Sequence, residues 1–305
     1  MKKLRSSLLL LIASIIWGIT FIAQSDAMEH IGPFTFNFAR SFIGSVVLLP
    51  VIRLFGRAEA GAANDIDKKK ARKALLVGGI LCGIALFAAT GLQQFGISLG
   101  SSVGKAGFIT SFYIILVPIF GLLLKKRTSA IIWISMLIAV VGLYLLCITE
   151  GFSIETSDLL YLGCAVFFAI HILIISVYSP LVNGVALSCM QFAVSAVLNG
   201  ICMLLLEKPS FSDIFAAYIP LLYAGVLACG IAYTLQIIGQ KDLDPTIASV
   251  IMCLESVVSV IAGWLILHQQ LSGRETAGCV IMLLATILAQ LPIGAGGKGK
   301  ASEQL

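Results

Sequence analysis

Long apolar runs separated by short polar stretches dominate the pattern of the chain. A run of about 20 apolar residues forms a helix that is long enough to cross ~30 Å of hydrocarbon. Ten such runs recur from one end to the other, so we expect an all-α integral membrane protein with ten transmembrane helices. The expected spans are 6–25, 34–55, 74–97, 104–124, 130–148, 158–178, 184–206, 214–238, 245–267 and 273–291.

The composition supports this interpretation and excludes a soluble globular chain. Of the 305 residues, 59% are hydrophobic and 11% are charged, whereas soluble proteins carry about 25% charged residues. Little sequence remains for a soluble domain. We expect segment 56–73 to be a cytoplasmic loop and 293–305 to be a flexible cytoplasmic tail. The eight cysteines form no CxxC motif, so neither a metal site nor a disulfide framework is indicated.

The positions of the lysines and arginines predict how the chain crosses the membrane. With ten spans, sixteen of these residues fall on the side of the N-terminus and three on the opposite side, while Arg40 lies within a span. Basic residues concentrate on the cytoplasmic side of membrane proteins. We therefore expect a multi-pass protein of the plasma membrane with both termini in the cytoplasm. Topology accounts for the basic loops, and no nucleic-acid partner is predicted.

The second half of the sequence weakly repeats the first. A shift of 151 residues places Arg40 on Gln191, and a shift of 142 residues places Tyr113 on Glu255 and Gln94 on Gln236. The predicted repeats are 1–150 and 157–292, with five spans each. Because five is an odd number, the two copies would cross the membrane in opposite directions, as in many secondary transporters whose binding site lies between the repeats.

Glu255 is the strongest candidate for a functional residue. It lies ten residues after Pro245, which at ~1.5 Å per residue places it about 15 Å deep in the membrane. Acidic side chains at this depth are costly and usually functional. Glu255 is a candidate proton carrier, cation ligand or partner of a buried base. The alternative is a structural carboxyl group that desolvation keeps protonated.

Two other ionisable residues, Arg40 and His171, lie well inside predicted spans and away from the span ends. Arg40 is expected about 9 Å below the outer surface, where it can hold a carboxylate or phosphate with two parallel hydrogen bonds. An ion pair with Glu255 would need a kink or a bridging water, because helical side chains lean toward their own N-terminus. Simple extension of Arg40 to the outer surface is the alternative. His171 is predicted either to be a satisfied structural histidine or to relay protons for coupling.

Several uncharged polar and aromatic residues complete the predicted substrate site. Gln94 and Gln236 occupy matching positions in the two repeats, and Tyr233 shares a helix face with Gln236. Trp17 and Tyr113 are aromatic side chains that can stack on a ligand, although apolar packing is the default explanation. Each polar residue can instead form hydrogen bonds between helices.

Pro118 is predicted to interrupt the helix that contains Tyr113. Proline has no amide hydrogen, so the carbonyl of Ile114 loses its helical partner. The sequence leaves open whether the resulting kink is static or acts as a hinge.

A resemblance to a known family rests on four segments: SIIWGITFIAQ (14–24), GPFTFNFARSFIG (32–44), SSVGKAGFITSFYIILVPIFGLLLKKR (101–127) and DPTIASVIMCLESVVSVIAGWLILHQQLSGRETAGCVIMLLA (244–285). Together they resemble the EamA family of the drug/metabolite transporter superfamily. The resemblance implies ten helices in two inverted repeats around a central cavity, and transport of small metabolites such as amino acids or related solutes. Where that family usually carries an acidic-basic pair, this chain has Lys126-Arg127 and Gln269-Gln270.

These observations predict a secondary transporter, working as an exporter, of a small polar metabolite, with the proton as a candidate coupling ion. A channel or facilitator is the first alternative. The second is a membrane-embedded hydrolase, because Gly100-Ser101-Ser102-Val103-Gly104 fits the G-x-S-x-G string, with Ser102 as the nucleophile. No histidine is evidently placed beside Ser102. The chain also lacks nucleotide-binding motifs, so no enzyme activity and no cofactor are predicted.

Overall fold

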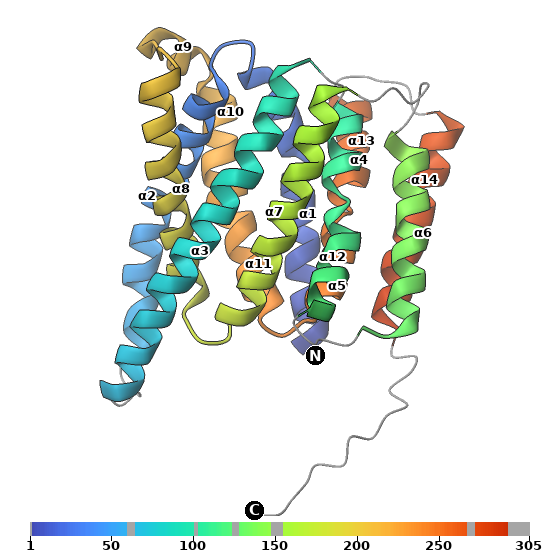
Figure 1. Ribbon diagram of the computed structural model, residues 1–305, viewed down its shortest axis with the longest axis horizontal. Coiled ribbons are helices and arrows are strands. Elements are labelled where there is room, and N and C mark those ends of the chain that lie inside the picture. Colours follow the sequence, from blue (N-terminus) through green and yellow to red (C-terminus); the bar gives the residue numbers. More distant parts are fainter. Residues whose placement is uncertain are drawn as a thin grey trace, which may run out of the picture.

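The protein is a single bundle of helices. The computed structural model describes residues 2–59, 65–100, 103–123, 128–147, 155–266 and 272–291. Its helices stand side by side, and the described connections gather at two opposite ends of the bundle (Figure 1). The helices are α1 (Lys2–Ala27), α2 (Pro33–Glu59), α3 (Asp65–Ser98), α4 (Val103–Thr110), α5 (Tyr113–Leu123), α6 (Ala130–Cys147), α7 (Thr156–Tyr178), α8 (Gly184–Leu206), α9 (Phe211–Ala216), α10 (Tyr218–Leu222), the π-helix η1 (Tyr223–Ala232), α11 (Tyr233–Gln240), α12 (Pro245–Met252), α13 (Glu255–Ile266) and α14 (Gly273–Gln290).

The bundle has the helix lengths of a membrane protein. Within the described residues, eight helical stretches are long and apolar enough to cross a bilayer. The apolar helix Ala130–Leu146 is shorter. α14 begins with the charged residues Arg274 and Glu275, which lower its apolar content. The all-helical fold expected from the sequence is therefore present, while the count of ten spans stays a prediction.

Polar and apolar side chains are distributed in the opposite way to those of a soluble protein. The polar side chains of Asn37, Gln94 and Gln191 are completely buried. Large apolar side chains such as Leu137 and Leu204 are exposed, by 60% and 75%. Exposed apolar surface on this scale marks an interaction surface and is expected of a multi-pass membrane protein.

The structure corrects the expectation of a loop over 56–73. α2 continues to Glu59 and α3 begins at Asp65, so both flanks of this polar segment are helical. Its composition explains the error, because Ala, Glu, Lys and Arg are strong helix formers even when they are hydrophilic. Apolar residues mark the part of a helix that lies inside the membrane, but they do not show where the helix itself ends.

Some sequence features lie outside the described residues. They are Ser102 of the hydrolase alternative, the tail 293–305, and the pairs Lys126-Arg127 and Gln269-Gln270.

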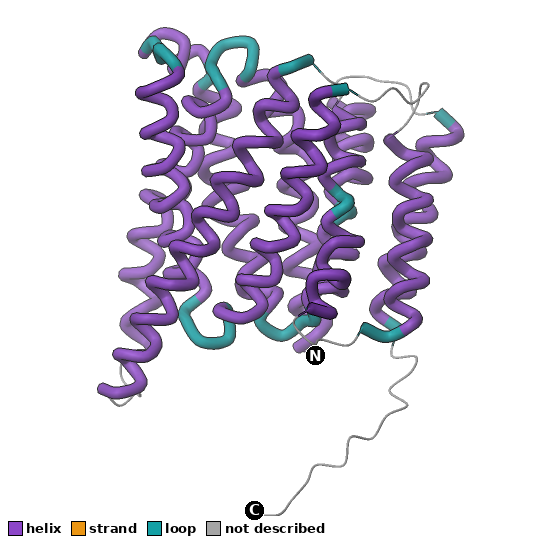
Figure 2. The backbone as a smooth tube through the Cα atoms, viewed as in Figure 1, coloured by secondary structure: helices purple, strands orange, loops and turns teal. Residues whose placement is uncertain are grey.

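Two membrane-crossing helices are interrupted halfway along their length. α4 and α5 are separated by a turn at Ser111 and Phe112, and α12 and α13 by a turn at Cys253 and Leu254. The first interruption is visible as a short loop segment inside the bundle (Figure 2). α5 runs through Pro118, so the break in this helix lies before the proline, and the kink expected at Pro118 stays a prediction.

The two interrupted helices lie against each other and run in opposite directions (Figure 1). α4 packs against α13, and α5 packs against α12. The Oγ atoms of Ser111 and Ser256 are 3.1 Å apart where the interruptions meet. The backbone amides of the turn residues Ser111, Phe112, Cys253 and Leu254 all donate hydrogen bonds to nearby backbone oxygens, as backbone at this depth of a membrane protein requires.

Glu207 at the end of α8 caps the first turn of α2. Its carboxylate accepts hydrogen bonds from the backbone nitrogens of Phe34 and Thr35, both at 2.8 Å, and from the Thr35 hydroxyl at 2.6 Å. These bonds satisfy amide groups that have no helical partner. The contact joins residues more than 170 positions apart.

We expect Glu207→Ala to lower the free energy of unfolding by ~0.5–2 kcal/mol, the usual effect of removing a helix cap. Glu207→Gln keeps one acceptor oxygen and should lose less. Thermal unfolding in detergent measures the difference, with the exposed Glu29 replaced by alanine as a control at another acidic position. Equal melting of Glu207→Ala and Glu29→Ala would contradict the capping role.

Candidate functional site

A cavity lies in the middle of the bundle and is lined by residues from nine of the described helices. It contains about 550 Å³ of space not filled by atoms, part of it continuous with solvent. The part of it that the centre of a water molecule can reach is about 50 Å³. α1 supplies Trp17, Thr20, Phe21 and Gln24. The other lining residues are Arg40, Gln93, Tyr113, Phe168, Ile172, Ala228, Tyr233, Gln236, Met252 and Glu255.

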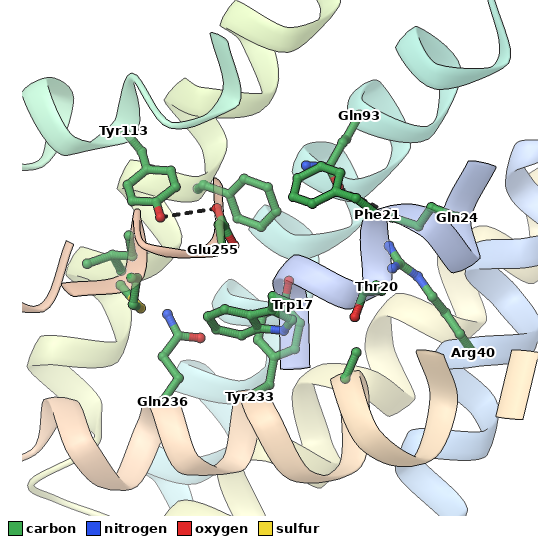
Figure 3. Close-up of a pocket in the computed structure, with 14 residues that line it drawn as sticks. Trp17, Thr20, Phe21, Gln24, Arg40, Gln93, Tyr113, Tyr233, Gln236 and Glu255 are labelled. Atoms are coloured by element: carbon green, nitrogen blue, oxygen red, sulfur yellow. Dashed lines mark hydrogen bonds between the residues drawn. The ribbon is translucent and has the colours of Figure 1, made fainter. Parts of the chain in front are cut away.

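The two helix interruptions place Glu255 and Tyr113 at one side of the cavity. Each is the first residue of the half-helix that follows its break. The hydroxyl of Tyr113 donates a hydrogen bond to Oε1 of Glu255 over 3.2 Å (Figure 3). Glu255 is 8% exposed and lies at the N-terminus of α13. The sequence shift of 142 residues had paired these two positions, and the structure brings them into contact.

Arg40 lies toward the opposite side of the same cavity (Figure 3). Its side chain is 5% exposed, and its guanidinium carbon lies 5.1 Å from the centre of the Phe36 ring. Among the described residues it forms no ion pair, so the Arg40–Glu255 pair considered from the sequence is absent there. The two charged groups instead face a shared space.

The cavity-facing glutamine of α3 is Gln93, and Gln94 does not line the cavity. Gln94 is fully buried and exchanges hydrogen bonds with Gln24, which donates to its Oε1 over 3.1 Å and accepts from its Nε2 over 3.2 Å. Gln24 also donates to Oε1 of Gln93 over 3.2 Å. Adjacent residues of a helix face directions ~100° apart, so repeat matching could not decide which glutamine reaches the cavity.

Aromatic side chains form the wall between the two charged residues. The rings of Trp17 and Tyr233 are 4.7 Å apart in an edge-to-face arrangement, and Gln236 lies beside them (Figure 3). Trp17 Nε1 and Gln236 Oε1 are buried without a hydrogen-bond partner in the described structure. A donor and an acceptor therefore remain available here.

The predicted coupling residue His171 lies behind this wall and does not line the cavity. Its Nε2 is 2.9 Å from Oε1 of Gln191, and its ring centre lies 6.0 Å from that of Tyr233. Its Nδ1 is buried without a hydrogen-bond partner in the described structure, so only one of the two ring nitrogens is satisfied there. A role in coupling stays a prediction.

The sequence reasoning missed several lining residues. Gln24 and Gln93 carried a detectable signal, because each is a strongly polar residue inside a predicted span. Phe21, Phe168 and Met252 carried none, since apolar residues look alike in an apolar helix.

The π-helix η1 also had no sequence signal. Such segments are rare and occur frequently at functional sites. η1 contributes Ala228 to the lining and leads directly into Tyr233 of α11.

The fold and the site define a multi-pass membrane protein with an internal polar cavity, and comparisons with known proteins give its class. The model of the EamA-like transporter family matches residues 4–148 and again 156–291. The chain belongs to the EamA-like transporter family. It is therefore a membrane transporter, a class that is distinct from enzymes.

Relatives and a solved structure agree with this assignment. An uncharacterized transporter of Archaeoglobus fulgidus is 31% identical over 294 residues, covering 96% of this chain and 88% of its own length. The uncharacterized transporter YoaV of Bacillus subtilis is 22% identical, covering 88% of this chain and 91% of its own length. A crystal structure with 18% identity has a TM-score of 0.76 over 93% of this chain and 96% of its own, which shows a shared fold.

Proposed function

We propose that this protein is a secondary transporter that exports a small polar metabolite, such as an amino acid or a related solute. The observation that carries the proposal is the cavity between the interrupted helices, where Arg40 and Glu255 are both buried and face the same space. Charged groups inside a membrane protein usually mark the path of a substrate or an ion. The interrupted helices are typical of transporter sites near the membrane midplane.

The proposed mechanism is alternating access between two inverted repeats of five helices each. Two contacts between the first and second halves of the chain support this mechanism, because they join equivalent positions with the roles of the two halves exchanged. A Cβ added to Gly83 would lie 2.6 Å from Val194 Cβ, and one added to Gly225 would lie 2.6 Å from Ile43 Cβ. Shifts of 142 and 151 residues relate Gly83 to Gly225 and Ile43 to Val194. Each repeat thus packs on the other through the same pair of positions, as a pseudo-twofold axis requires.

The proposed orientation places both termini in the cytoplasm of a cell bounded by the plasma membrane. The start of α1 and the end of α14 lie at the same end of the bundle (Figure 1). The basic residues at the start of α1 and in the first turns of α3 lie at that end as well, in agreement with the positive-inside rule.

Glu255 is the proposed coupling residue, with the proton as the candidate ion. A carboxyl group that contacts both the cavity and Tyr113 can exchange a proton when the cavity faces water on either side. A channel would expose the same residues to both sides at once, whereas the meeting of the interrupted helices favours a closed central site.

We expect purified protein in liposomes to move radiolabelled amino acids with saturable kinetics and to show exchange stimulated by the same solute on the opposite side. Flux that rises linearly with concentration would identify the channel alternative. Empty liposomes and liposomes with heat-denatured protein are the controls. Inside-out membrane vesicles that accumulate solute would support export, and accumulation only in right-side-out vesicles would contradict it.

A further inference from the structure

Arg40 is a buried cation without a counter-charge in the described structure. Among the described residues that line the cavity, it is the one basic residue. Its Nη2 atom is buried and has no hydrogen-bond partner, and among the described residues its guanidinium forms neither a hydrogen bond nor an ion pair. A buried charge that lacks a partner is strongly unfavourable. The cavity must therefore supply an anion or water to this group.

Contacts on two faces of α2 fix the backbone around Arg40. The neighbouring Asn37 donates to the backbone oxygen of Thr90 over 3.2 Å, which ties α2 to α3. On the other face of α2, the backbone oxygen of Arg40 lies close to Gly225. Figure 3 shows the guanidinium directed toward Thr20 and Gln24 at the end of the cavity away from Glu255.

The groups around Arg40 leave a second donor available. Gln24 uses its amide nitrogen to donate to Gln93 and Gln94, and the Thr20 hydroxyl donates to the backbone oxygen of Ile16 over 2.7 Å. Because Gln93 accepts through its oxygen, its amide nitrogen is directed elsewhere, and it makes none of the hydrogen bonds found among the described residues. Arg40 and Gln93 thus offer charged and neutral donors to one ligand.

We propose that Arg40 and Gln93 form the subsite that binds a carboxylate group of the transported solute. This inference rests on the proposed transport function and specifies the chemistry of its cargo. A guanidinium matches the two oxygens of a carboxylate. A carboxylate brings one negative charge to Arg40, whereas a doubly charged phosphate would place more negative charge in the cavity that also contains Glu255.

The first test compares solutes that differ only in this group. Purified wild-type protein is heated with an equimolar mixture of amino acids, or with a mixture of the corresponding amino-acid amides, which lack the carboxylate charge. We expect the acids to raise Tm and the amides to have at least tenfold lower apparent affinity. Equal stabilisation by both mixtures, or by neither, would overturn the assignment. This comparison needs no variant.

The second test uses Arg40→Gln, Arg40→Lys and a matched control, Arg53→Gln. Arg53 is an exposed arginine near the other end of the same helix. We expect Arg40→Gln to weaken binding of the acids by ~10- to 100-fold. Arg40→Lys keeps the positive charge but lacks the paired N–H groups of the guanidinium, so its affinity for the acids should lie between those of the wild type and Arg40→Gln. Arg53→Gln should match the wild type. Unchanged acid binding in a folded Arg40→Gln variant would overturn the assignment.

Flux measurements separate this inference from the transport function. If liposomes move the amides with saturable kinetics and exclude the acids, the protein is a transporter and the carboxylate subsite is wrong. If they move neither mixture, both proposals fail.

Discussion

Replacing Glu255 with glutamine is expected to abolish solute movement driven by a proton gradient, while saturable exchange down a concentration gradient continues. Glutamine keeps the size of the side chain and can still accept the hydrogen bond that Tyr113 donates over 3.2 Å. It cannot release or bind a proton in this pH range. Uptake into liposomes with and without an imposed gradient measures the effect, and the stimulated component should drop to the level seen without a gradient.

The matched control is Glu275→Gln. Glu275 lies in the first turn of α14, where its side chain accepts from the backbone nitrogen of Ser272 over 2.8 Å. Glutamine also serves in such a capping box, so this variant should transport like the wild type. Gradient stimulation that survives in Glu255→Gln would show that Glu255 is not the proton carrier and would make His171 the next candidate.

The positions of the interrupted helices explain why part of the site could be predicted from the sequence. Glu255 and Arg40 were recognisable because charged residues are rare in apolar spans and rarely face lipid. The match of Tyr113 with Glu255 came from the weak repeat. In the structure, each of these two residues begins the second half of an interrupted helix. The same local geometry therefore occurs in both helices and accounts for the match.

The remainder of the site depends on helix rotation and packing, which the sequence does not specify. Gln93 and Gln94 are adjacent and chemically identical, and both accept hydrogen bonds from Gln24; only the rotation of α3 determines that Gln93 lines the cavity. Pro118 was a stronger local signal for an interruption than Ser111 and Phe112. The protein tolerates the proline within α5 and breaks the helix where it meets its counterpart, so a tertiary contact overrides the local propensity.

We expect Gly18→Ala to destabilise the protein and to impair transport. A Cβ at this position of α1 would lie 2.6 Å from Val258 Cβ and 2.7 Å from the backbone oxygen of Glu255. The backbone oxygen cannot move without shifting the start of α13. Overpacking of this kind costs ~1–3 kcal/mol, so Tm should fall. The shift would also displace the Glu255 carboxyl relative to the cavity and reduce flux in liposomes.

Gly107→Ala provides the control that separates the close contact from the loss of a glycine. Gly107 lies in α4, beside the same crossing of helices, and a Cβ there would meet only Ser256 Oγ, at an ordinary 3.7 Å. Both substitutions raise helix propensity by a similar amount, about 1 kcal/mol, so Gly107→Ala should melt at or above the wild-type temperature. If both variants melt alike, close packing of α1 against α13 does not hold the interrupted helix in place. If only Gly18→Ala loses stability and flux together, the position of the Glu255 break is set by a glycine more than 230 residues earlier in the chain.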